Sequence, residues 1–340
     1  MKGKRKNMHR KKIIMDVDTG SDDALAIMCA VLCPDEFDII GICSVNGNRP
    51  VENTTENTLR VIKLLGATDI PVLKGASSPL VADLYPERAL RCQASETEDP
   101  EGNTIAYHSE YLPLPPSGME PAENTPAAVW MVNTLLSSDE KVTLILTGPL
   151  TDLALAYRLA PSIIEHISEI VIMGGGHDQR NTTGAAEFNI FADPEAAAIV
   201  FSIGVYVPIT LMTLDATHMA YLDEDDVRRL RSAHNPICDF AAEEVEERIK
   251  AYDTLQPLAV PGIAPIHDAL CVLYLIDPRV ITKKEFLHVE IVCGGNANGM
   301  TLIDTRRSCP DPKNVNVCFA TDTSLFKELM CATLEKSTVI

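Results

Sequence analysis

KIIMDVDTGSDDALAIMCA, residues 12–30, decides which fold the sequence predicts. Its apolar run at residues 13–15 is typical of a buried strand in a parallel sheet. After a glycine turn, the apolar run at residues 24–28 predicts a helix whose N-cap is Ser21 or Asp22. A strand that leads directly into a helix indicates an open α/β sheet, which binds its ligands at the carboxyl ends of its strands.

Four carboxylates crowd the end of this first strand: Asp16, Asp18, Asp22 and Asp23. Carboxylates so close together repel and raise one another's pKa unless positive charge lies among them. Capping a helix requires one aspartate, so a simple cap and turn leaves the other three unexplained. A hard divalent cation accounts for all four, and the stretch therefore predicts a metal site.

Later strands bring further polar side chains to the same edge of the sheet. Residues 37–45 predict a strand whose C-terminal turn ends at Asn48. Residues 142–147 predict another, after which the backbone carbonyl of Thr147 could face the metal. Taken alone, each is also an ordinary turn residue.

Two more polar groups follow in the second half of the chain. Asn181, Glu187 and Asn189 suit vicinal hydroxyls, because Glu accepts hydrogen bonds and Asn both donates and accepts them. His267 and Asp268 open an apolar helix, and a lone His is usually a packing residue. Beside the aspartates, this pair instead suggests a metal ligand and a proton donor.

The rest of the chain predicts one α/β domain with a mostly parallel central sheet flanked by helices, a Rossmann-like open sheet. We expect a basic disordered tail at residues 1–11, ahead of a domain at residues 12–340. Residues 76–124 show no sustained period and predict an irregular flap. The acidic helical segment 223–256 is expected to expose its charges to solvent. From residue 285 onward, FLHVEIVCGG and NVNVCFATD predict antiparallel edge strands.

Composition excludes several classes of function. The 340 residues carry a net charge of -19, which argues against non-specific binding to nucleic acid or to an anionic membrane. The basic start lacks the apolar region of a signal peptide, and no apolar run reaches the ~18 residues of a membrane span. The ten cysteines show no CxxC pair or zinc-like spacing, so they predict buried thiols and a cytoplasmic location.

Taken together, the motifs resemble those of the inosine-uridine preferring nucleoside hydrolases. The matching segments keep the family's order: DVDTGSDDA (16–24), VNGN (45–48), LTGPLTD (146–152), MGGG (173–176), TTGAAEFN (182–189), DPEAA (193–197) and HDA (267–269). The resemblance implies hydrolysis of the N-glycosidic bond of ribonucleosides to ribose and free base, with one bound Ca²⁺. It also implies a homodimer or homotetramer.

The resemblance further implies a role for each site residue. Asp18, Asp23, the Thr147 carbonyl and Asp268 would hold the Ca²⁺, and Asp18 would act as general base toward a water bound to it. The implied ribose-binding residues are Asp22, Asn181, Glu187 and Asn189, with Asn48 beside the ion and water. His267 is the candidate acid for the leaving base. Apart from the resemblance, the flap offers His108, Tyr107 and Tyr111 as candidate contacts, and the candidates for contact with the base are His108, Tyr252 and Gln256.

Two alternatives compete with this interpretation. Residues 16–19, DVDT, satisfy the DxDxT motif of haloacid-dehalogenase-type phosphohydrolases, with Asp16 as nucleophile and Mg²⁺ as the ion. That reading lacks a basic residue suited to the phosphate and leaves the later motifs unexplained. A non-catalytic protein that binds nucleosides or ribose would need neither the base Asp18 nor the acid His267.

Overall fold

The computed structural model describes residues 10–81, 84–86, 96–98, 102 and 104–336. Within them a nine-stranded sheet has the order β12-β11-β13-β8-β7-β6-β1-β2-β3. Neighbours from β3 to β13 run parallel, and β11 and β12 join antiparallel. The strands are β1 (Lys11–Val17), β2 (Phe37–Ser44), β3 (Val72–Lys74), β6 (Val142–Leu146), β7 (Ile167–Met173), β8 (Ile209–Met212), β11 (Ile281–Ile291), β12 (Thr301–Asp304) and β13 (Val315–Thr321). The predicted mostly parallel α/β sheet is confirmed.

Strand β1 lies near the centre of the sheet, between β2 and β6, and both of its faces are buried. Met15 and Val17 pack in the core on one face, whereas Ile14 packs in the core on the other. Side chains of a strand alternate between faces, so a strand covered on both sides reads as a continuous apolar run. This is why residues 13–15 were recognisable in the sequence.

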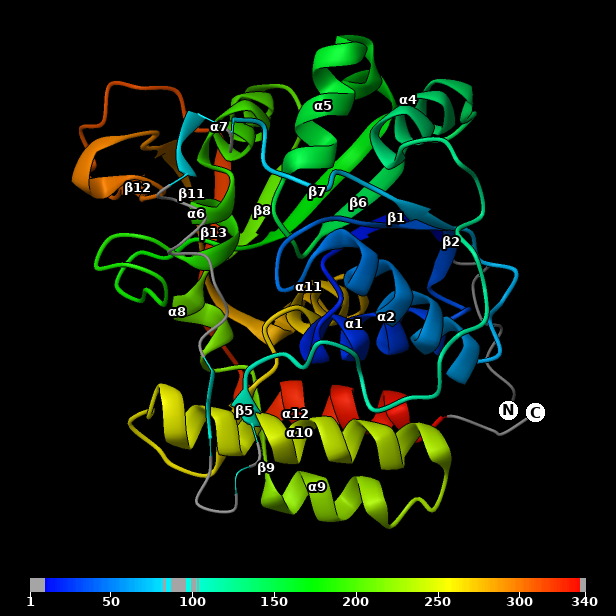
Figure 1. Ribbon diagram of the computed structural model, residues 1–340. Coiled ribbons are helices and arrows are strands. Elements are labelled where there is room, and N and C mark those ends of the chain that lie inside the picture. The colour runs from blue at the N-terminus through cyan, green and yellow to red at the C-terminus, as the bar shows by residue number, and fades with distance from the viewer. Residues whose placement is uncertain (1–9, 82–83, 87–95, 99–101, 103, 337–340) are drawn as a thin grey trace, which may run out of the picture.

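Helices cover both faces of the sheet (Figure 1). On one face lie α1 (Ser21–Val31), α2 (Val51–Leu64) and α11 (Ala269–Ile276); on the other lie α4 (Ala127–Ser137), α5 (Thr151–Leu159) and α7 (Pro194–Ser202). Shorter helices are α6 (Phe188–Ala192), α8 (Leu214–Thr217), η2 (Pro161–His166), η3 (Ile203–Val205), η4 (Pro278–Val280) and η5 (Gly295–Ala297). No helix among the described residues is both long and apolar enough to cross a membrane.

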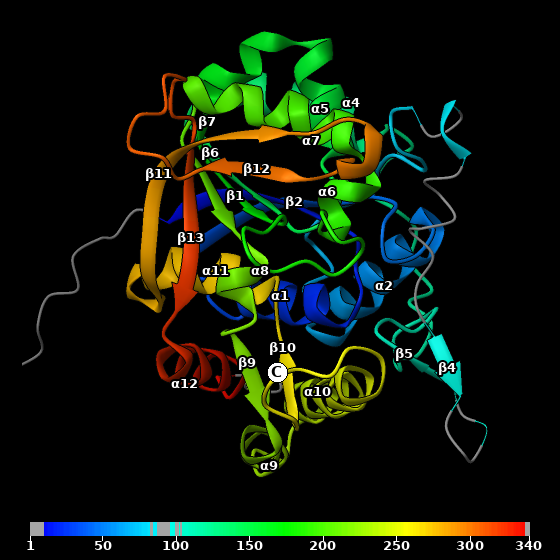
Figure 2. The same cartoon turned by 90° about the vertical axis from the view of Figure 1, so that its left-hand side faces the viewer.

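A further layer lies outside α1 and α11 (Figure 2). It contains α9 (Glu224–Arg231), α10 (Pro236–Leu255) and α12 (Thr323–Leu334), with the antiparallel pair β9 (Tyr221–Asp223) and β10 (Ile263–Pro265). Helix α12 packs on α1, where Cys29 Sγ lies 3.4 Å from Met330 Sδ. The predicted acidic helical segment is therefore two helices, and α10 has a buried face toward the body of the protein.

The C-terminal strands correct one prediction. Residues 315–321 do not form an antiparallel edge strand, because β13 lies inside the sheet, parallel to β8 and antiparallel to β11. Val315 and Val317 are fully buried there. Alternating sequences occur on covered as well as exposed strands, so the pattern did not distinguish these positions. Strand β11 is antiparallel as predicted, but it lies between β13 and β12, so β12 is the edge on this side.

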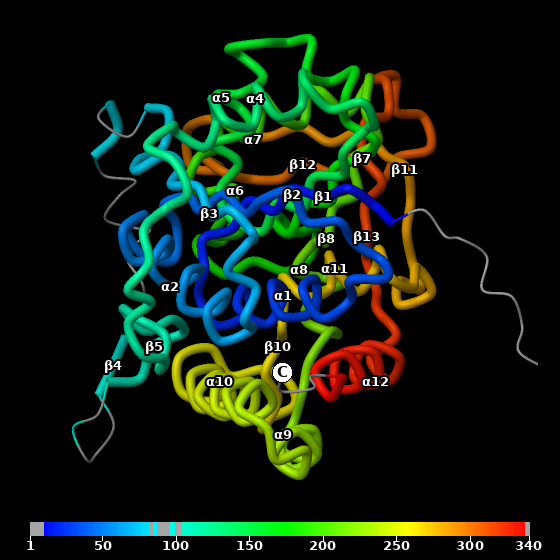
Figure 3. The backbone as a smooth tube through the Cα atoms, turned by 90° about the vertical axis from the view of Figure 1, so that its right-hand side faces the viewer, coloured from blue at the N-terminus to red at the C-terminus, as the bar shows by residue number. Residues whose placement is uncertain are grey.

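Two predicted segment boundaries also shift. Lys11 belongs to β1 rather than to the basic tail, and residues 1–9 lie outside the described residues. Inside the predicted irregular flap, β4 (Glu96–Glu98) pairs antiparallel with β5 (Thr104–Ala106). Strand β5 of the flap lies next to helix α10 (Figure 3).

Candidate active site

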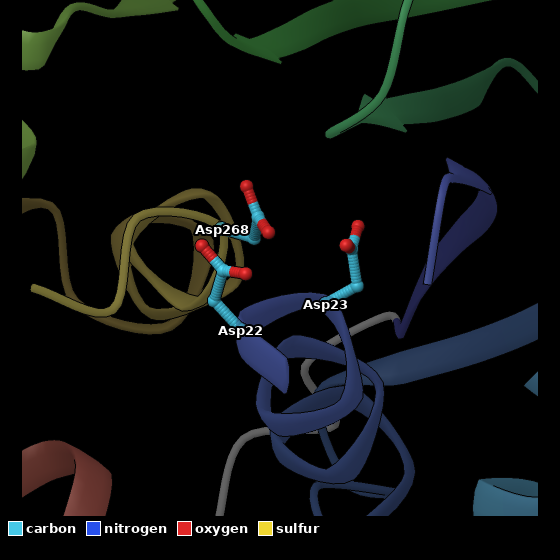
Figure 4. A group of neighbouring side chains, drawn as sticks. All are labelled: Asp22, Asp23 and Asp268. Atoms are coloured by element: carbon cyan, nitrogen blue, oxygen red, sulfur yellow. The ribbon is translucent and has the colours of Figure 1, made fainter. Parts of the chain in front are cut away.

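Three carboxylates meet where α1 and α11 begin. Asp22 and Asp23 lie in the first turn of α1, and Asp268 directly precedes α11 (Figure 4). Each contributes one oxygen to a group whose atoms all lie within 4.8 Å of one another, and all three residues are buried. The predicted juxtaposition of residues more than 240 positions apart is therefore present in the fold.

The start of α1 differs from the prediction in a way that matters for the site. The N-cap is Gly20, not Ser21 or Asp22, and the Asp23 carboxylate accepts the Gly20 N–H at 3.0 Å. A cap residue spends its side chain on the helix backbone. Because Asp23 closes the helix end instead, Ser21 and Asp22 can direct their side chains toward other elements.

Burial and mutual repulsion govern the protonation of these groups. Burial, reinforced by the Asp22 charge, raises the pKa of Asp23 to about 7. Burial, and then the charges of Asp22 and Asp23, raises the pKa of Asp268 well above its ordinary value. Carboxylates in this condition are stabilised by a cation placed among them.

Asp18, at the end of β1, lies against the turn after β2. Its Oδ2 accepts the Asn48 backbone N–H at 2.7 Å, and the Asn48 side-chain amide donates to the Asp18 carbonyl at 3.2 Å and to Asp23 Oδ2 at 3.3 Å. A Cβ on Gly47 would lie 2.0 Å from Asp18 Oδ2, so the close approach requires glycine. Burial, and then Asp23, raises the pKa of Asp18 well above its ordinary value.

Thr147 and Asn189 join the cluster from the far side. The Thr147 hydroxyl donates to Asp23 Oδ1 at 2.7 Å, and the Thr147 carbonyl accepts from Asn189 Nδ2 at 2.6 Å. The carbonyl that we expected to face a metal is thus held in place by an amide. A carbonyl oxygen has a second lone pair, which can bind a cation.

Glu187 caps α6 and is held by backbone N–H groups. It accepts from Gly175 at 2.8 Å, Asn189 at 3.0 Å and Ile190 at 3.2 Å. Burial raises the pKa of Glu187 to about 7, although these hydrogen bonds oppose the shift. Asn181 is exposed at the rim, where its Oδ1 accepts the Phe188 N–H at 2.9 Å.

His267 belongs to a short chain of hydrogen-bonding groups. Its Nε2 lies 2.6 Å from the Tyr252 hydroxyl and its Nδ1 lies 2.7 Å from the Thr217 hydroxyl. Burial lowers the pKa of His267 well below its ordinary value. Burial thus disfavours the charged ring. In the neutral ring, one nitrogen donates to one of these hydroxyls and the other nitrogen accepts from the second.

Arg248 is the site residue that the sequence analysis missed. Its guanidinium, on the buried face of α10, forms a two-point contact with the Asp22 carboxylate at 3.1 and 3.2 Å. Burial alone would raise the pKa of Asp22, but Arg248 and then His108 outweigh it, so that pKa lies below its ordinary value. The available signal was an arginine four residues before Tyr252, on the same helical face.

The flap contributes His108 and Tyr107. His108 Nδ1 accepts the Ser21 backbone N–H at 3.3 Å, and Arg49 donates to the His108 carbonyl through Nε at 3.2 Å and through a terminal nitrogen at 2.6 Å. The Tyr107 and Tyr252 rings meet edge to face at 5.3 Å between centroids. Tyr111, also a candidate contact, packs instead against Arg60, whose guanidinium carbon lies 4.7 Å from the ring centroid.

These side chains line one pocket. It includes the predicted site residues except Asp16, Asp23 and Tyr111, of which the two aspartates are buried. Arg248, Tyr107 and Gln256 also line it. The arrangement combines an acidic floor with polar and aromatic walls, which suits a neutral polyhydroxylated molecule carrying a ring.

Residues 13–328 match the family model of the inosine-uridine preferring nucleoside hydrolases. The chain belongs to this family. A pyrimidine-specific ribonucleoside hydrolase, RihB, from Escherichia coli O1:K1 is 36% identical over 320 residues, which cover 94% of this chain and 95% of that protein. Members of this nucleoside hydrolase family cleave N-glycosyl bonds, and the chain is such an enzyme.

Solved structures agree with this membership. A purine-preferring ribonucleoside hydrolase from Gardnerella vaginalis has a TM-score of 0.80 and 28% identity, covering 96% of this chain and 100% of that one. A plant nucleoside hydrolase, PpNRh1, has a TM-score of 0.79 and 25% identity, covering 96% and 99%. The predicted family and fold are confirmed.

Family membership overturns the phosphohydrolase alternative, and the structure gives the physical reason. A nucleophile must reach the substrate, but Asp16 is 1% exposed and does not line the pocket. It lies beneath the sheet edge near Asp152, where burial and then the Asp152 charge raise its pKa. The non-catalytic binding alternative is likewise excluded by membership in a hydrolase family.

Proposed function

We propose that this nucleoside hydrolase cleaves ribonucleosides with a bound Ca²⁺, with Asp18 as general base and His267 as general acid. The observation that supports the proposal best is the convergence of Asp22, Asp23 and Asp268 in a buried cluster, to which Asn48 joins Asp18 by bonding to both Asp18 and Asp23. Within the cluster, Asp22 is the carboxylate that Arg248 pairs. Substrate binding would involve Asp22, Asn48, Asn181, Glu187 and Asn189.

The chemistry of the donor set fits a hard divalent cation. Asp18, Asp23, Asp268 and the Thr147 carbonyl would hold it, and all four groups offer oxygen, which Ca²⁺ prefers. Burial and mutual repulsion raise the pKa values of these three carboxylates, and a cation placed among them would relieve that repulsion. When bound, the cation would acidify the attacking water and orient the ribose hydroxyls.

Side chains of this protein would perform the proton transfers. The Asp18 carboxylate would take a proton from the water that attacks C1′ of the ribose, while the bond from C1′ to the base nitrogen breaks. Positive charge develops on the ribose ring, so the nearby carboxylates of Asp22 and Glu187 stabilise the transition state. His267 would supply a proton to the leaving base, and the Tyr252 hydroxyl, 2.6 Å away, can relay it.

The printed names of the relatives guide the choice of substrates. The bacterial relative is pyrimidine-specific, whereas the structural neighbour from Gardnerella vaginalis is purine-preferring. Because the first shares more sequence with this chain, we place uridine and cytidine ahead of inosine and adenosine.

The proposal predicts release of free base from a ribonucleoside in the presence of Ca²⁺. Base release from uridine, cytidine, inosine and adenosine should be measured chromatographically with and without EDTA. Asp18→Asn should lower kcat by about 10²-fold or more, because the general base is removed. EDTA should abolish release, and added Ca²⁺ should restore it.

Asp69→Asn is the matched control, since Asp69 is exposed and outside the pocket. It should retain wild-type kcat. Absence of base release from all four substrates, or wild-type kcat in Asp18→Asn, would refute the proposal.

A further inference from the structure

The Arg248 guanidinium uses all of its donors inside the protein. It is 2% exposed, and its hydrogen bonds reach Ser21 Oγ at 2.7 Å, the two Asp22 oxygens at 3.1 and 3.2 Å, and the Pro265 carbonyl at 3.0 and 3.2 Å. Arginine has five N–H donors, and these five contacts account for them. A side chain fixed at every donor cannot reorient without losing several hydrogen bonds.

These contacts join three elements around the pocket. Arg248 is carried by α10, Ser21 and Asp22 begin α1, and Pro265 ends β10 just before His267. Helices α10 and α1 also supply the pocket residues Tyr252 and Asp22, and the pocket residue His267 follows β10 by two positions. The guanidinium therefore lies where the separate parts of the site meet.

The geometry of the Asp22 contact is directional. Two N–H groups of a planar fork meet the two oxygens of one carboxylate, which fixes both its position and its rotation. A lysine ammonium has the same charge but no fork, so it cannot impose that orientation. Within the acidic cluster, Asp22 is therefore held by Arg248, whereas Asp23 is held by hydrogen bonds from Thr147 and Gly20.

We propose that Arg248 is a positioning residue that fixes the Asp22 carboxylate in the orientation that accepts a hydrogen bond from a ribose hydroxyl. The inference deepens the proposed function and rests on it. Arg248 itself need not touch the substrate: it acts through Asp22. The competing explanation is that the pair only stabilises the fold, as buried ion pairs sometimes do.

A double-mutant cycle separates these explanations. Arg248→Met, Asp22→Asn and the double variant should be assayed for kcat and KM with uridine, or with whichever ribonucleoside the enzyme cleaves best. Each single change should raise KM about tenfold or more. The double variant should match Asp22→Asn within about threefold, because Arg248 has nothing left to orient.

Two further measurements test whether Arg248 acts by orienting Asp22, rather than by its charge alone or by maintaining the fold. Arg248→Lys keeps the charge without the fork, so its KM should rise about as much as in Arg248→Met. It also serves in the cycle if the methionine variant fails to fold. The Ca²⁺ affinity of the substrate-free variants, measured by calorimetry, should not fall, because Arg248 does not contact the proposed ligands Asp23 and Asp268.

Arg231→Met is the matched control. Arg231 forms a similar two-point contact with Glu246 of α10, at 3.1 and 2.5 Å, but at an exposed position outside the pocket. Its KM should remain at the wild-type value.

Three outcomes would overturn the inference. The first is a KM increase in the double variant that equals the product of the two single increases. The others are an unchanged KM in Arg248→Met and a wild-type KM in Arg248→Lys. A wild-type enzyme that releases no base would refute the proposed function instead. The same cycle, run on the dissociation constant for uridine, would then still decide the role of Arg248.

Discussion

His108 illustrates how single side chains at this site are held in one protonation state. Its ring covers the start of α1, and Nδ1 accepts the Ser21 N–H at 3.3 Å, so the proton of the neutral ring is on Nε2. Burial lowers the pKa of His108 to about 4, the Asp22 charge opposes this shift, and Arg248 adds to it. The folded protein therefore disfavours protonation of this ring.

This shift predicts how His108 affects stability with pH. The unfolded ring binds a proton near its ordinary pKa of about 6.5, whereas the folded ring does so near 4, so the unfolded state binds more protons between these values. The contribution of His108 is complete above pH 6.5 and is lost as the pH falls toward 4. Its size is at most about 3 kcal/mol.

Urea unfolding of wild type and His108→Asn between pH 7 and pH 4 tests this prediction. The Asn Oδ1 can accept the Ser21 N–H, but the side chain does not titrate. Taking the difference between the two proteins cancels the titration of groups that do not interact with His108, and leaves that of His108 together with its neighbour Asp22. The wild type should lose stability relative to the variant as the pH falls, and a constant difference would contradict the assigned pKa.

At the residue scale, the sequence identified the groups whose chemical type is unusual for their place. Four aspartates after one strand have no simple structural purpose, so Asp18, Asp22 and Asp23 stood out. Arg248 did not, because a cation on an acidic helix is usually exposed. Only the fold reveals that its helix turns this side chain inward, toward residues 226 and 227 positions away in the chain.

At the scale of elements, the start of α1 and the flap form one unit. A Cβ on Gly20 would lie 2.0 Å from His108 Nδ1, so the absence of a side chain at this position allows the flap to approach the helix. The Gly20 φ of -104° is accessible to any residue. A substitution there therefore tests the contact with His108 and introduces no backbone strain.

Gly20→Ala should therefore displace His108 and the flap without unfolding the protein. We expect KM for a ribonucleoside to rise about tenfold or more, with a loss of stability of about 1 kcal/mol, the scale of a local overpacking. Gly294→Ala is the control, because nothing lies within 4 Å of a Cβ there and its φ of 163° is extended. Equal effects of the two substitutions on KM would contradict the contact.

The sequence located most elements but not their surroundings. Strands β1 and β6 and helices α1 and α11 were predictable, because buried runs and helix starts leave local patterns. The interior position of β13 and the buried face of α10 depend on elements far away in the chain, so no local pattern recorded them. The N-cap at Gly20 was missed because Asp23 closes the helix from inside.

At the scale of the whole molecule, the proposed metal site links the two halves of the chain. A ligand that binds only the folded state stabilises it, by about 2.7 kcal/mol at a hundredfold excess over its dissociation constant. Ca²⁺ should therefore raise the Tm of the wild type by several degrees. The same addition should leave Asp268→Asn nearly unchanged.

Thermal unfolding with EDTA and with Ca²⁺ checks this prediction, with Asp69→Asn as the control that keeps the full shift. In EDTA, Asp268→Asn should be at least as stable as the wild type, because it removes one of several buried carboxylates that repel one another. An equal Ca²⁺ shift in wild type and Asp268→Asn would exclude Asp268 as a ligand. The assembly of subunits and the cytoplasmic location stay predictions.

The packing of α12 on α1 has a consequence for how the protein is made. Cys29 and Met330 touch across 301 residues of chain, so the helix that carries Asp22 and Asp23 keeps an apolar flank uncovered until the last helix is synthesised. At a translation rate of about 5–20 residues per second, this interval lasts roughly 15 to 60 s. Nascent chains thus expose the segment that later forms the floor of the active site, and their protection by chaperones would determine how much active enzyme accumulates.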